Sequence, residues 1–181
     1  MRVSIQNLVF DENVYVRLIG VNTLEDELIS KEAYHQVKKL AAEKYGVADW
    51  TIEKSAFGKP FFVNNAMHYL SISHTDNMIA IAVCKGFSIG IDIEKIHKMS
   101  EKLVEKYYAE NEKKAILLNE HGKEKEEIKI WTLKEAHCKC TGEGLSRNTL
   151  RWDSISDSSF FHESRCVDDY VITVCKERMD L

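Results

Sequence analysis

The chain has 181 residues, 44% of them hydrophobic and 30% charged, and carries a formal net charge of −4. This composition allows a folded core without a disulfide or metal staple, and the negative charge argues against a nucleic-acid-binding protein. The five cysteines include no CxxC pair and no apolar run is long enough to span a membrane. The N-terminus reads as a strand rather than a signal peptide, so we expect a cytoplasmic protein with reduced thiols and no membrane contact.

The first half of the chain predicts short strands around one helix. Residues 25–45 repeat apolar side chains at helical spacing, and Gly46 is the expected stop. Six segments read as extended or as strands, and they span residues 2–9, 14–20, 50–63, 69–73, 78–83 and 87–93.

The second half predicts two helices followed by strands. Residues 100–121 are helical and charged, Gly122 breaks the helix, and a second helix spans about 124–141. The mixed charges between 101 and 129 are typical of a solvated helical hairpin. Residues 149–176 read as strands separated by polar turns.

The order of these elements predicts an α+β fold of two similar lobes, each a small antiparallel sheet with a packed helix. We expect the N-terminal lobe to span residues 1–85 and the C-terminal lobe residues 86–181. No residue-level repeat accompanies this order, so the internal duplication rests on the elements alone.

The hexapeptide IGIDIE, residues 89–94, reads as a strand with two different faces. Alternate side chains of a strand share a face, so the three isoleucines would point into a core and Asp92 and Glu94 would lie together opposite them. Two like charges at this spacing repel unless a cation or a base neutralises them. Taken alone, the hexapeptide favours a half-buried strand with a solvated acidic face.

The segment WTLKEAHCK, residues 131–139, lies on the predicted second helix. Glu135 and Lys139 are four residues apart and share a face, whereas Lys134 is rotated by about 100°. By itself this pattern fits an exposed Glu–Lys pair. The GEGL sequence that follows at 142–145 predicts a tight loop in which the backbone can approach a ligand closely.

Two shorter motifs precede these segments. SISH, residues 71–74, ends a strand with a hydroxyl and an imidazole, which can hold a phosphate by hydrogen bonds. FGKP, residues 57–60, combines a flexible glycine, a positive charge and a fixed turn. Each motif alone is an ordinary turn.

Together and in this order, FGKP, SISH, IGIDIE and WTLKE with Lys139 resemble the 4′-phosphopantetheinyl transferase superfamily. More narrowly they resemble its two-lobed members, which activate surfactin synthetase and related assembly lines. The clear resemblance covers about residues 57–145. It implies an active site in the cleft between two lobes, in a monomer that is a pseudo-dimer. The smaller trimeric holo-acyl-carrier-protein synthases are shorter and place the aspartate near the N-terminus, so the two-lobed type fits better.

The resemblance implies a metal site and a catalytic set. Asp92, Glu94 and Glu135 would hold Mg²⁺, a hard cation that prefers oxygen ligands, with Mn²⁺ as the alternative metal. Glu135 and Lys139 would also serve catalysis. The family pattern of two aromatic residues followed by a glutamate is matched by YYAENE, residues 107–112, and adds Glu112.

Coenzyme A would be the co-substrate and would be held by residues from both lobes. The implied contacts are Gly58, Lys59 and Pro60 at the adenine and phosphate region, Ser73 and His74 at the 3′-phosphate, and Lys134 with Lys139 at the pyrophosphate. The chain departs from the family at residues 21–27, which are short and acidic where larger members carry basic residues. Candidates to replace that part of the phosphate clamp are Ser30, Lys31, Lys38 and Lys39.

The implied reaction moves phosphopantetheine from coenzyme A to a serine of an apo acyl or peptidyl carrier protein. The serine hydroxyl attacks the β-phosphate and 3′,5′-ADP leaves, with catalysis by positioning and electrostatics. The base that takes the serine proton stays open among Glu135, Glu112 and a metal-bound water. The acidic carrier would dock on a basic face, for which the candidates are Lys95, Lys98, Lys102 and Lys106.

Two alternative functions remain at this point. One is a magnesium-dependent hydrolase of phosphate esters that uses the same carboxylates. The other is a non-catalytic domain that binds coenzyme A or a carrier protein without transfer. Magnesium-dependent turnover of a carrier protein separates these alternatives from the transferase.

Overall fold

The computed structural model describes residues 3–22, 25–119 and 122–178. The strands in these ranges are β1 (Val3–Asp11), β2 (Val14–Val21), β3 (Ile52–Lys54), β4 (Pro60–Phe62), β5 (His68–Thr75), β6 (Met78–Lys85), β7 (Ile89–Lys95), β8 (Phe160–Val167) and β9 (Tyr170–Glu177). The helices are α1 (Asp26–Tyr45), α2 (Glu101–Tyr107), α3 (Glu110–Leu118), α4 (Lys123–Thr141) and α5 (Arg147–Leu150).

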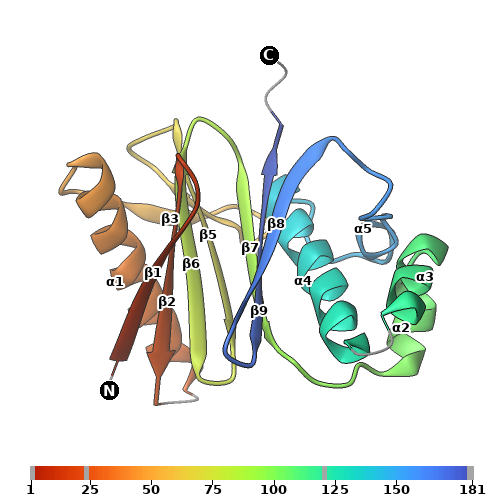
Figure 1. Cartoon of the computed structure of the whole chain (residues 1–181). Helices are drawn as coiled ribbons and strands as arrows, with labels where there is room; N and C mark the ends of the chain where they lie inside the picture. Colours follow the sequence, from red (N-terminus) through yellow and green to blue (C-terminus); the bar gives the residue numbers. More distant parts are fainter. Residues whose placement is uncertain (1–2, 23–24, 120–121, 179–181) are drawn as a thin grey trace.

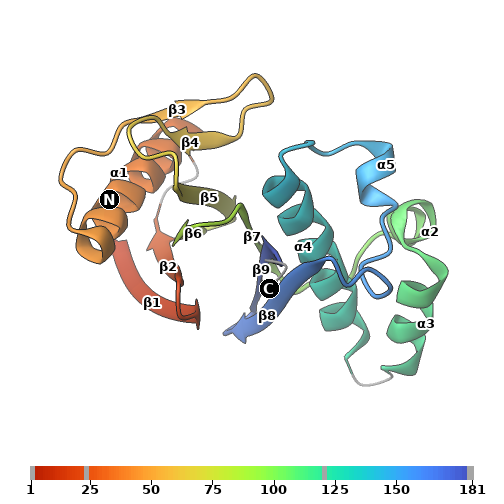
Figure 2. The same cartoon turned by 90° about the horizontal axis from the view of Figure 1, so that it is seen from above.

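These elements are stacked in layers (Figure 1). One antiparallel sheet has the strand order β1-β2-β6-β5, and a second has the order β7-β9-β8. Helix α1 covers the outer face of the first sheet and α4 covers the outer face of the second, while the two sheets face each other (Figure 2). The predicted α+β fold with two sheet-and-helix lobes is confirmed. The boundary between the two lobes near residue 85 stays a prediction.

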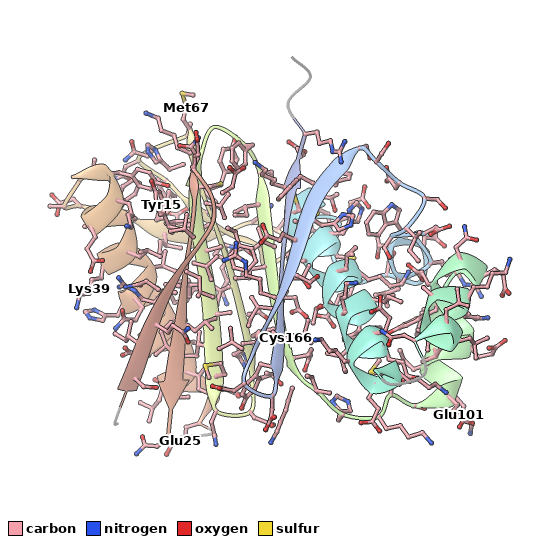
Figure 3. All side chains as sticks on the ribbon, in the orientation of Figure 1. Tyr15, Glu25, Lys39, Met67, Glu101 and Cys166 are labelled. Carbon is pink, nitrogen blue, oxygen red and sulfur yellow. The ribbon has the colours of Figure 1, made fainter. Side chains whose placement is uncertain are left out.

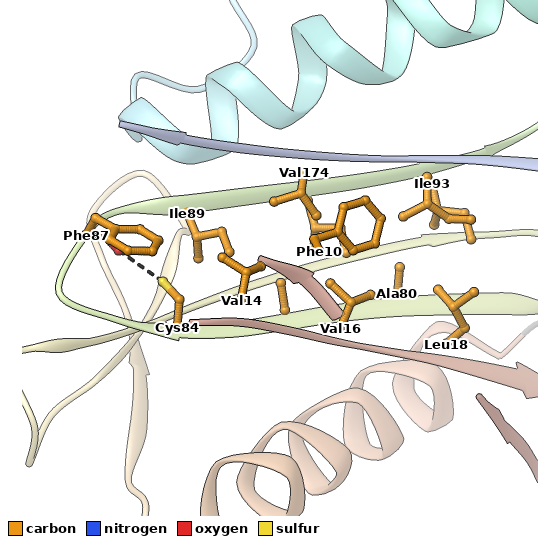
Figure 4. Close-up of a cluster of buried hydrophobic side chains, with 13 residues drawn as sticks. Phe10, Val14, Val16, Leu18, Ala80, Cys84, Phe87, Ile89, Ile93 and Val174 are labelled. Atoms are coloured by element: carbon orange, nitrogen blue, oxygen red, sulfur yellow. Dashed lines mark hydrogen bonds between the residues drawn. The ribbon is translucent and has the colours of Figure 1, made fainter. Parts of the chain in front are cut away.

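The core between the sheets follows from the alternation of side chains along the strands. Figure 4 shows apolar side chains of β2 and β6 facing those of β7 and β9 across this layer. The three isoleucines of IGIDIE are fully buried there, as predicted from their spacing. Burying one such side chain contributes about 1.5–3 kcal/mol, so this layer is a large part of what joins the two lobes.

Helix α1 follows its predicted bounds to within one residue. Its buried residues recur three, four or one position apart on a single face, and they are Ile29, Ala33, Gln36, Val37, Leu40 and Ala41. The helix ends at Gly46, whose φ of 70° is the left-handed conformation that glycine adopts at low cost.

A close approach between β7 and α4 fixes the second lobe. A Cβ atom at Gly90 would lie 1.9 Å from the backbone oxygen of Ala136 and 2.6 Å from the nitrogen of Cys140. Any side chain at this position would therefore push the helix away from the strand. Because Gly90 alternates with Asp92 and Glu94, the same face of β7 carries the two carboxylates toward α4.

Two segments differ from the prediction. The charged stretch from 100 is two helices rather than one, because the chain turns to an extended conformation at Tyr108 and Ala109. Residues 149–159 form the end of α5 and turns instead of strand, and β8 begins only at Phe160. Residues 2, 23–24 and 120–121, which belong to predicted segments, lie outside the described residues.

Figure 3 shows the described side chains, with Tyr15 and Lys39 on the α1 side of the first sheet and Glu101, the first residue of α2, at the far end of the molecule. In the described ranges, no helix is both long enough and apolar enough to cross a membrane.

Candidate functional site

The acidic face of β7 is buried against α4 rather than solvated. Asp92 is 1% exposed and Glu94 is half-buried. Burial raises the pKa of Asp92, because the charged carboxylate loses water, while Lys139 and Ser73 oppose that shift. A buried negative charge of this kind needs a partner.

Lys139 supplies that partner from the opposite element. Its Nζ lies 2.6 Å from Asp92 Oδ1 and 2.8 Å from Ser73 Oγ. Ser73 Oγ in turn donates to Asp92 Oδ1 at 2.7 Å. Strand β5, strand β7 and helix α4 therefore meet at one carboxylate oxygen. The second oxygen, Asp92 Oδ2, is buried and has no hydrogen-bond partner among the described residues.

Glu135 lies at the same place. Together with Asp92 and Glu94 it forms a cluster of three carboxylates, called the acidic group below. Glu135 lies one turn before Lys139, with its carboxylate 3.9 Å from the lysine Nζ. Burial, followed by the charge of Asp92, raises the pKa of Glu135 to about 7. The pKa of Glu94 is raised by the same two causes in the same order. The three carboxylates thus disfavour one another's ionisation, which a bound cation would reverse.

These residues fit a magnesium site that is completed by a substrate. Within residues 3–22, 25–119 and 122–178, no three His, Cys, Asp or Glu side chains are gathered closely enough to enclose a metal by themselves. Mg²⁺ usually binds one or two carboxylates together with water and substrate phosphates rather than an all-protein cage. The unpartnered, buried Asp92 Oδ2 is an oxygen that such an ion would satisfy.

A row of hydroxyl groups on β5 faces this acidic group. Ser71, Ser73 and Thr75 alternate along the strand and share one face. Ser71 Oγ accepts a hydrogen bond from the backbone N–H of Ile91 at 3.0 Å, and Thr75 Oγ1 donates to Glu94 Oε2 at 3.0 Å. Together with Ser73, they connect β5 to β7, although the two strands belong to different sheets.

A pocket of about 220 Å³ opens beside the acidic group, between the β3–β4 hairpin and the C-terminal end of α4. Figure 2 shows the hairpin and the α4–α5 connection on the same side of the molecule. One wall comes from FGKP, residues 57–60, and the other from Lys139 and the glycine loop that follows α4. Phe57 and Leu145 are exposed apolar side chains that line it from opposite lobes.

Lys59 of FGKP reaches across this pocket to the other lobe. Its Nζ donates to the carbonyl oxygen of Cys140 at 2.7 Å and to Ser88 Oγ at 3.0 Å. The Cys140 carbonyl belongs to the last turn of α4, where backbone oxygens lack helical partners and attract cations. In this structure Lys59 therefore caps α4, and burial lowers its pKa.

Ser73 and His74 point in different directions. Ser73 is buried against Asp92, whereas His74 is exposed and lines a smaller pocket beside α1. Ser30, one of the candidates for the missing part of the phosphate clamp, lines that pocket too, together with Lys54. The structure thus separates two residues that the resemblance assigns to one phosphate.

Lys134 and Glu112 lie apart from the acidic group. Lys134 Nζ is 2.8 Å from Glu112 Oε2, and both side chains are fully buried. Glu112 also accepts hydrogen bonds from the backbone of Ala109 and from the backbone and hydroxyl of Ser154. Neither side chain is open to a ligand in the pocket in this structure, and Glu112 is not part of a solvated hairpin.

Sequence reasoning assigned no role to Thr75 or Ser88, both of which have defined partners here. The signal for Thr75 was the alternation of hydroxyl residues at 71, 73 and 75 beside a strand that carries two carboxylates. Ser88 carried no signal, because its partner is a lysine 29 residues away.

Comparison with known proteins agrees with this geometry. The sequence model of the 4′-phosphopantetheinyl transferase superfamily matches residues 88–175, which include the carboxylates of β7 and α4. The chain belongs to the 4′-phosphopantetheinyl transferase superfamily. The resemblance inferred from the four motifs is confirmed.

Three curated 4′-phosphopantetheinyl transferases are similar to this chain. The protein gsp of Aneurinibacillus migulanus is 29% identical over 141 residues, which is 74% of this chain and 55% of that protein. The protein ffp of Bacillus subtilis is 31% identical over 124 residues, 66% of this chain and 53% of its own length. The protein psf-1 of Bacillus pumilus is 27% identical over 126 residues, 68% of this chain and 51% of its length. This member of the superfamily thus spans about half the length of the curated relatives it matches.

Proposed function

We propose that this chain transfers the phosphopantetheine group of coenzyme A to a serine of an apo acyl or peptidyl carrier protein and releases 3′,5′-ADP. The observation that carries this proposal is the meeting of Asp92, Glu135 and Lys139 beside a pocket lined by both lobes. Membership of the superfamily supports the reaction class. The relatives are named 4′-phosphopantetheinyl transferases, and that activity is proposed here for a chain whose match covers about half of each relative.

The metal we propose is Mg²⁺, with Mn²⁺ as the alternative, held by Asp92, Glu94 and Glu135. When bound, it would neutralise charge on the pyrophosphate of coenzyme A. The chain's own cation, Lys139, lines the pocket and is partly exposed, so its ammonium group can also reach a phosphate oxygen there. A positive charge at this position stabilises the negative charge that develops on the leaving phosphate.

Glu135 is the carboxylate we propose as the proton acceptor for the carrier serine. Glu112, the other glutamate considered for this task, is fully buried in its ion pair with Lys134. Glu135 is 15% exposed and belongs to the acidic group beside the pocket.

The proposed binding surfaces follow from the same layout. Coenzyme A would occupy the pocket between FGKP and the end of α4, with Gly58 and Pro60 as lining residues. The carrier protein would dock near the exposed lysines between the end of β7 and α2, which are Lys95, Lys98, Lys102 and Lys106. We propose that the chain acts as a cytoplasmic monomer.

Intact-protein mass spectrometry tests this function. An apo carrier protein is incubated with coenzyme A, Mg²⁺ and either the wild-type chain or its Asp92→Ala variant, with EDTA as a control. We expect a mass gain of one phosphopantetheine group that EDTA and the substitution both abolish. Coenzyme A binding without any gain on several unrelated carriers would favour the non-catalytic domain, and release of phosphate or phosphopantetheine to solvent would favour the hydrolase.

A further inference from the structure

The three hydroxyl groups on β5, those of Ser71, Ser73 and Thr75, form hydrogen bonds to residues of β7. β5 and β7 run side by side in the same direction, since residues 71, 73 and 75 pair with residues 91, 92 and 94 in rising order. No backbone ladder joins them, because β5 ends one sheet and β7 begins the other. The side-chain hydroxyls therefore take the place of the missing backbone hydrogen bonds between the two lobes.

Two of the three hydroxyls are bound to carboxylates of the acidic group. Ser73 Oγ donates to Asp92 Oδ1 at 2.7 Å, and Thr75 Oγ1 donates to Glu94 Oε2 at 3.0 Å. Each bond engages one carboxylate oxygen and restricts rotation of the group. For Asp92 this leaves Oδ2 as the buried oxygen without a partner among the described residues.

We propose that Ser73 and Thr75 are positioning residues that hold the Asp92 and Glu94 carboxylates in the orientation that binds the divalent cation. This inference rests on the metal site of the proposed function. The inference adds to that site a role for the N-terminal sheet. The acidic ligands lie on β7 and α4, but strand β5 of the N-terminal sheet would set the orientation of two of them. Outer partners that orient metal-binding carboxylates typically account for a 10- to 100-fold change in metal affinity.

Ser71 provides a matched control on the same strand. It has the same chemistry, the same face and the same partner strand, but its Oγ accepts from the backbone N–H of Ile91 instead of donating to a carboxylate. Removing its hydroxyl should weaken the contact between β5 and β7 without freeing a carboxylate. If metal affinity depended only on the contact between the two lobes, Ser71→Ala would therefore weaken metal binding as well.

The experiment is a titration with Mn²⁺ as the probe, in which free Mn²⁺ is followed by electron paramagnetic resonance. Wild type is titrated without and with saturating coenzyme A, and the variants are compared without it, because Ser71 also lines the pocket proposed for coenzyme A. Thr75→Val keeps the branched shape of threonine, and circular dichroism checks that each variant is folded. We expect Thr75→Val and Ser73→Ala each to weaken Mn²⁺ binding about 10-fold, and Ser71→Ala to leave it within about 2-fold of wild type.

Three outcomes would overturn the inference. They are wild-type affinity in folded Thr75→Val, an equal loss in Ser71→Ala, and no Mn²⁺ binding by the wild-type chain with or without coenzyme A. No carrier protein is present in this titration. A failure of the transfer reaction, seen by mass spectrometry, would therefore be distinguishable from a failure of the positioning role.

Discussion

Lys139 Nζ lies 2.6 Å from Asp92 Oδ1, so one ammonium group on α4 neutralises a carboxylate that β7 buries. The aspartate side chain is 1% exposed and the lysine side chain 28%. Removing the lysine would leave a buried charge without compensation. We expect Lys139→Met to lower the free energy of unfolding by about 3 kcal/mol, the low end for a broken buried pair, because the lysine is partly solvated.

Urea denaturation without metal measures this loss, and Lys31→Met is its control. Lys31 Nζ lies 2.6 Å from Glu27 Oε1, the same distance, but the two side chains are 69% and 80% exposed. Such a surface pair contributes within about 0.5 kcal/mol. Equal losses in the two variants would contradict the view that burial makes the Lys139–Asp92 contact important.

Lys59 should stabilise the chain even in the absence of coenzyme A. Its ammonium group binds the Cys140 carbonyl at the end of α4 and the Ser88 hydroxyl, both in the other lobe. We therefore expect Lys59→Met to lower the free energy of unfolding by about 1–2 kcal/mol without ligand. Thermal unfolding measures this loss of stability. The control variant is Lys39→Met, because Lys39 is an exposed lysine on α1. No change in the ligand-free protein would mean that Lys59 acts on the ligand alone.

The buried pair of Lys134 and Glu112 should show strong coupling. Lys134→Met alone leaves Glu112 charged and buried, and we expect a loss of roughly 3–5 kcal/mol. Adding Glu112→Gln removes that charge and keeps an oxygen for the Ser154 donors, so it should recover at least about 1 kcal/mol. A double-mutant cycle in urea measures the coupling. Strictly additive losses would show that the ion pair does not act as a unit.

His137 should make stability depend on pH. Its ring is stacked on Trp152 at 3.8 Å, and burial lowers its pKa below the usual value of 6.5. The unfolded chain therefore binds a proton more readily, and the contribution of the neutral ring is present above about pH 6.5 and is lost as the pH falls below it.

The comparison of wild type with His137→Phe isolates this contribution from that of the carboxylates. Phenylalanine keeps a flat ring against Trp152 and cannot take up a proton. We expect wild type to lose stability relative to the variant between pH 7 and pH 5, as measured by urea denaturation at each pH. A difference that stays constant over this interval would argue that His137 titrates normally.

Much of the fold could be predicted from local patterns. The bounds of α1 and the buried face of β7 follow from helical and strand periodicity, and the glycines at 46 and 142 mark the helix ends. The two-helix break at Tyr108 was missed because the charge pattern continues through it. The turns of 149–159 were missed because their hydrogen bonds join side chains to backbone nearby, which periodicity does not record.

The candidate site could be predicted in its residues but not in its contacts. The spacing of IGIDIE indicated that Asp92 and Glu94 share a face of one strand. The spacing of residues 131–139 indicated that Glu135 and Lys139 share a face of the helix. It could not show that Lys59 caps α4 or that Lys134 is sealed against Glu112, because those partners come from distant parts of the chain. Only tertiary packing brings them together.

The central claim is that the carboxylates facing Lys139 carry out phosphopantetheine transfer. The most direct measurement is the rate of mass gain of an apo carrier protein with coenzyme A and Mg²⁺, for wild type, Glu135→Gln and Glu124→Gln. Glu124 is an exposed glutamate in the first turn of the same helix. We predict that Glu124→Gln matches wild type and that Glu135→Gln is at least about 100-fold slower. Transfer by Glu135→Gln at the wild-type rate would contradict the account.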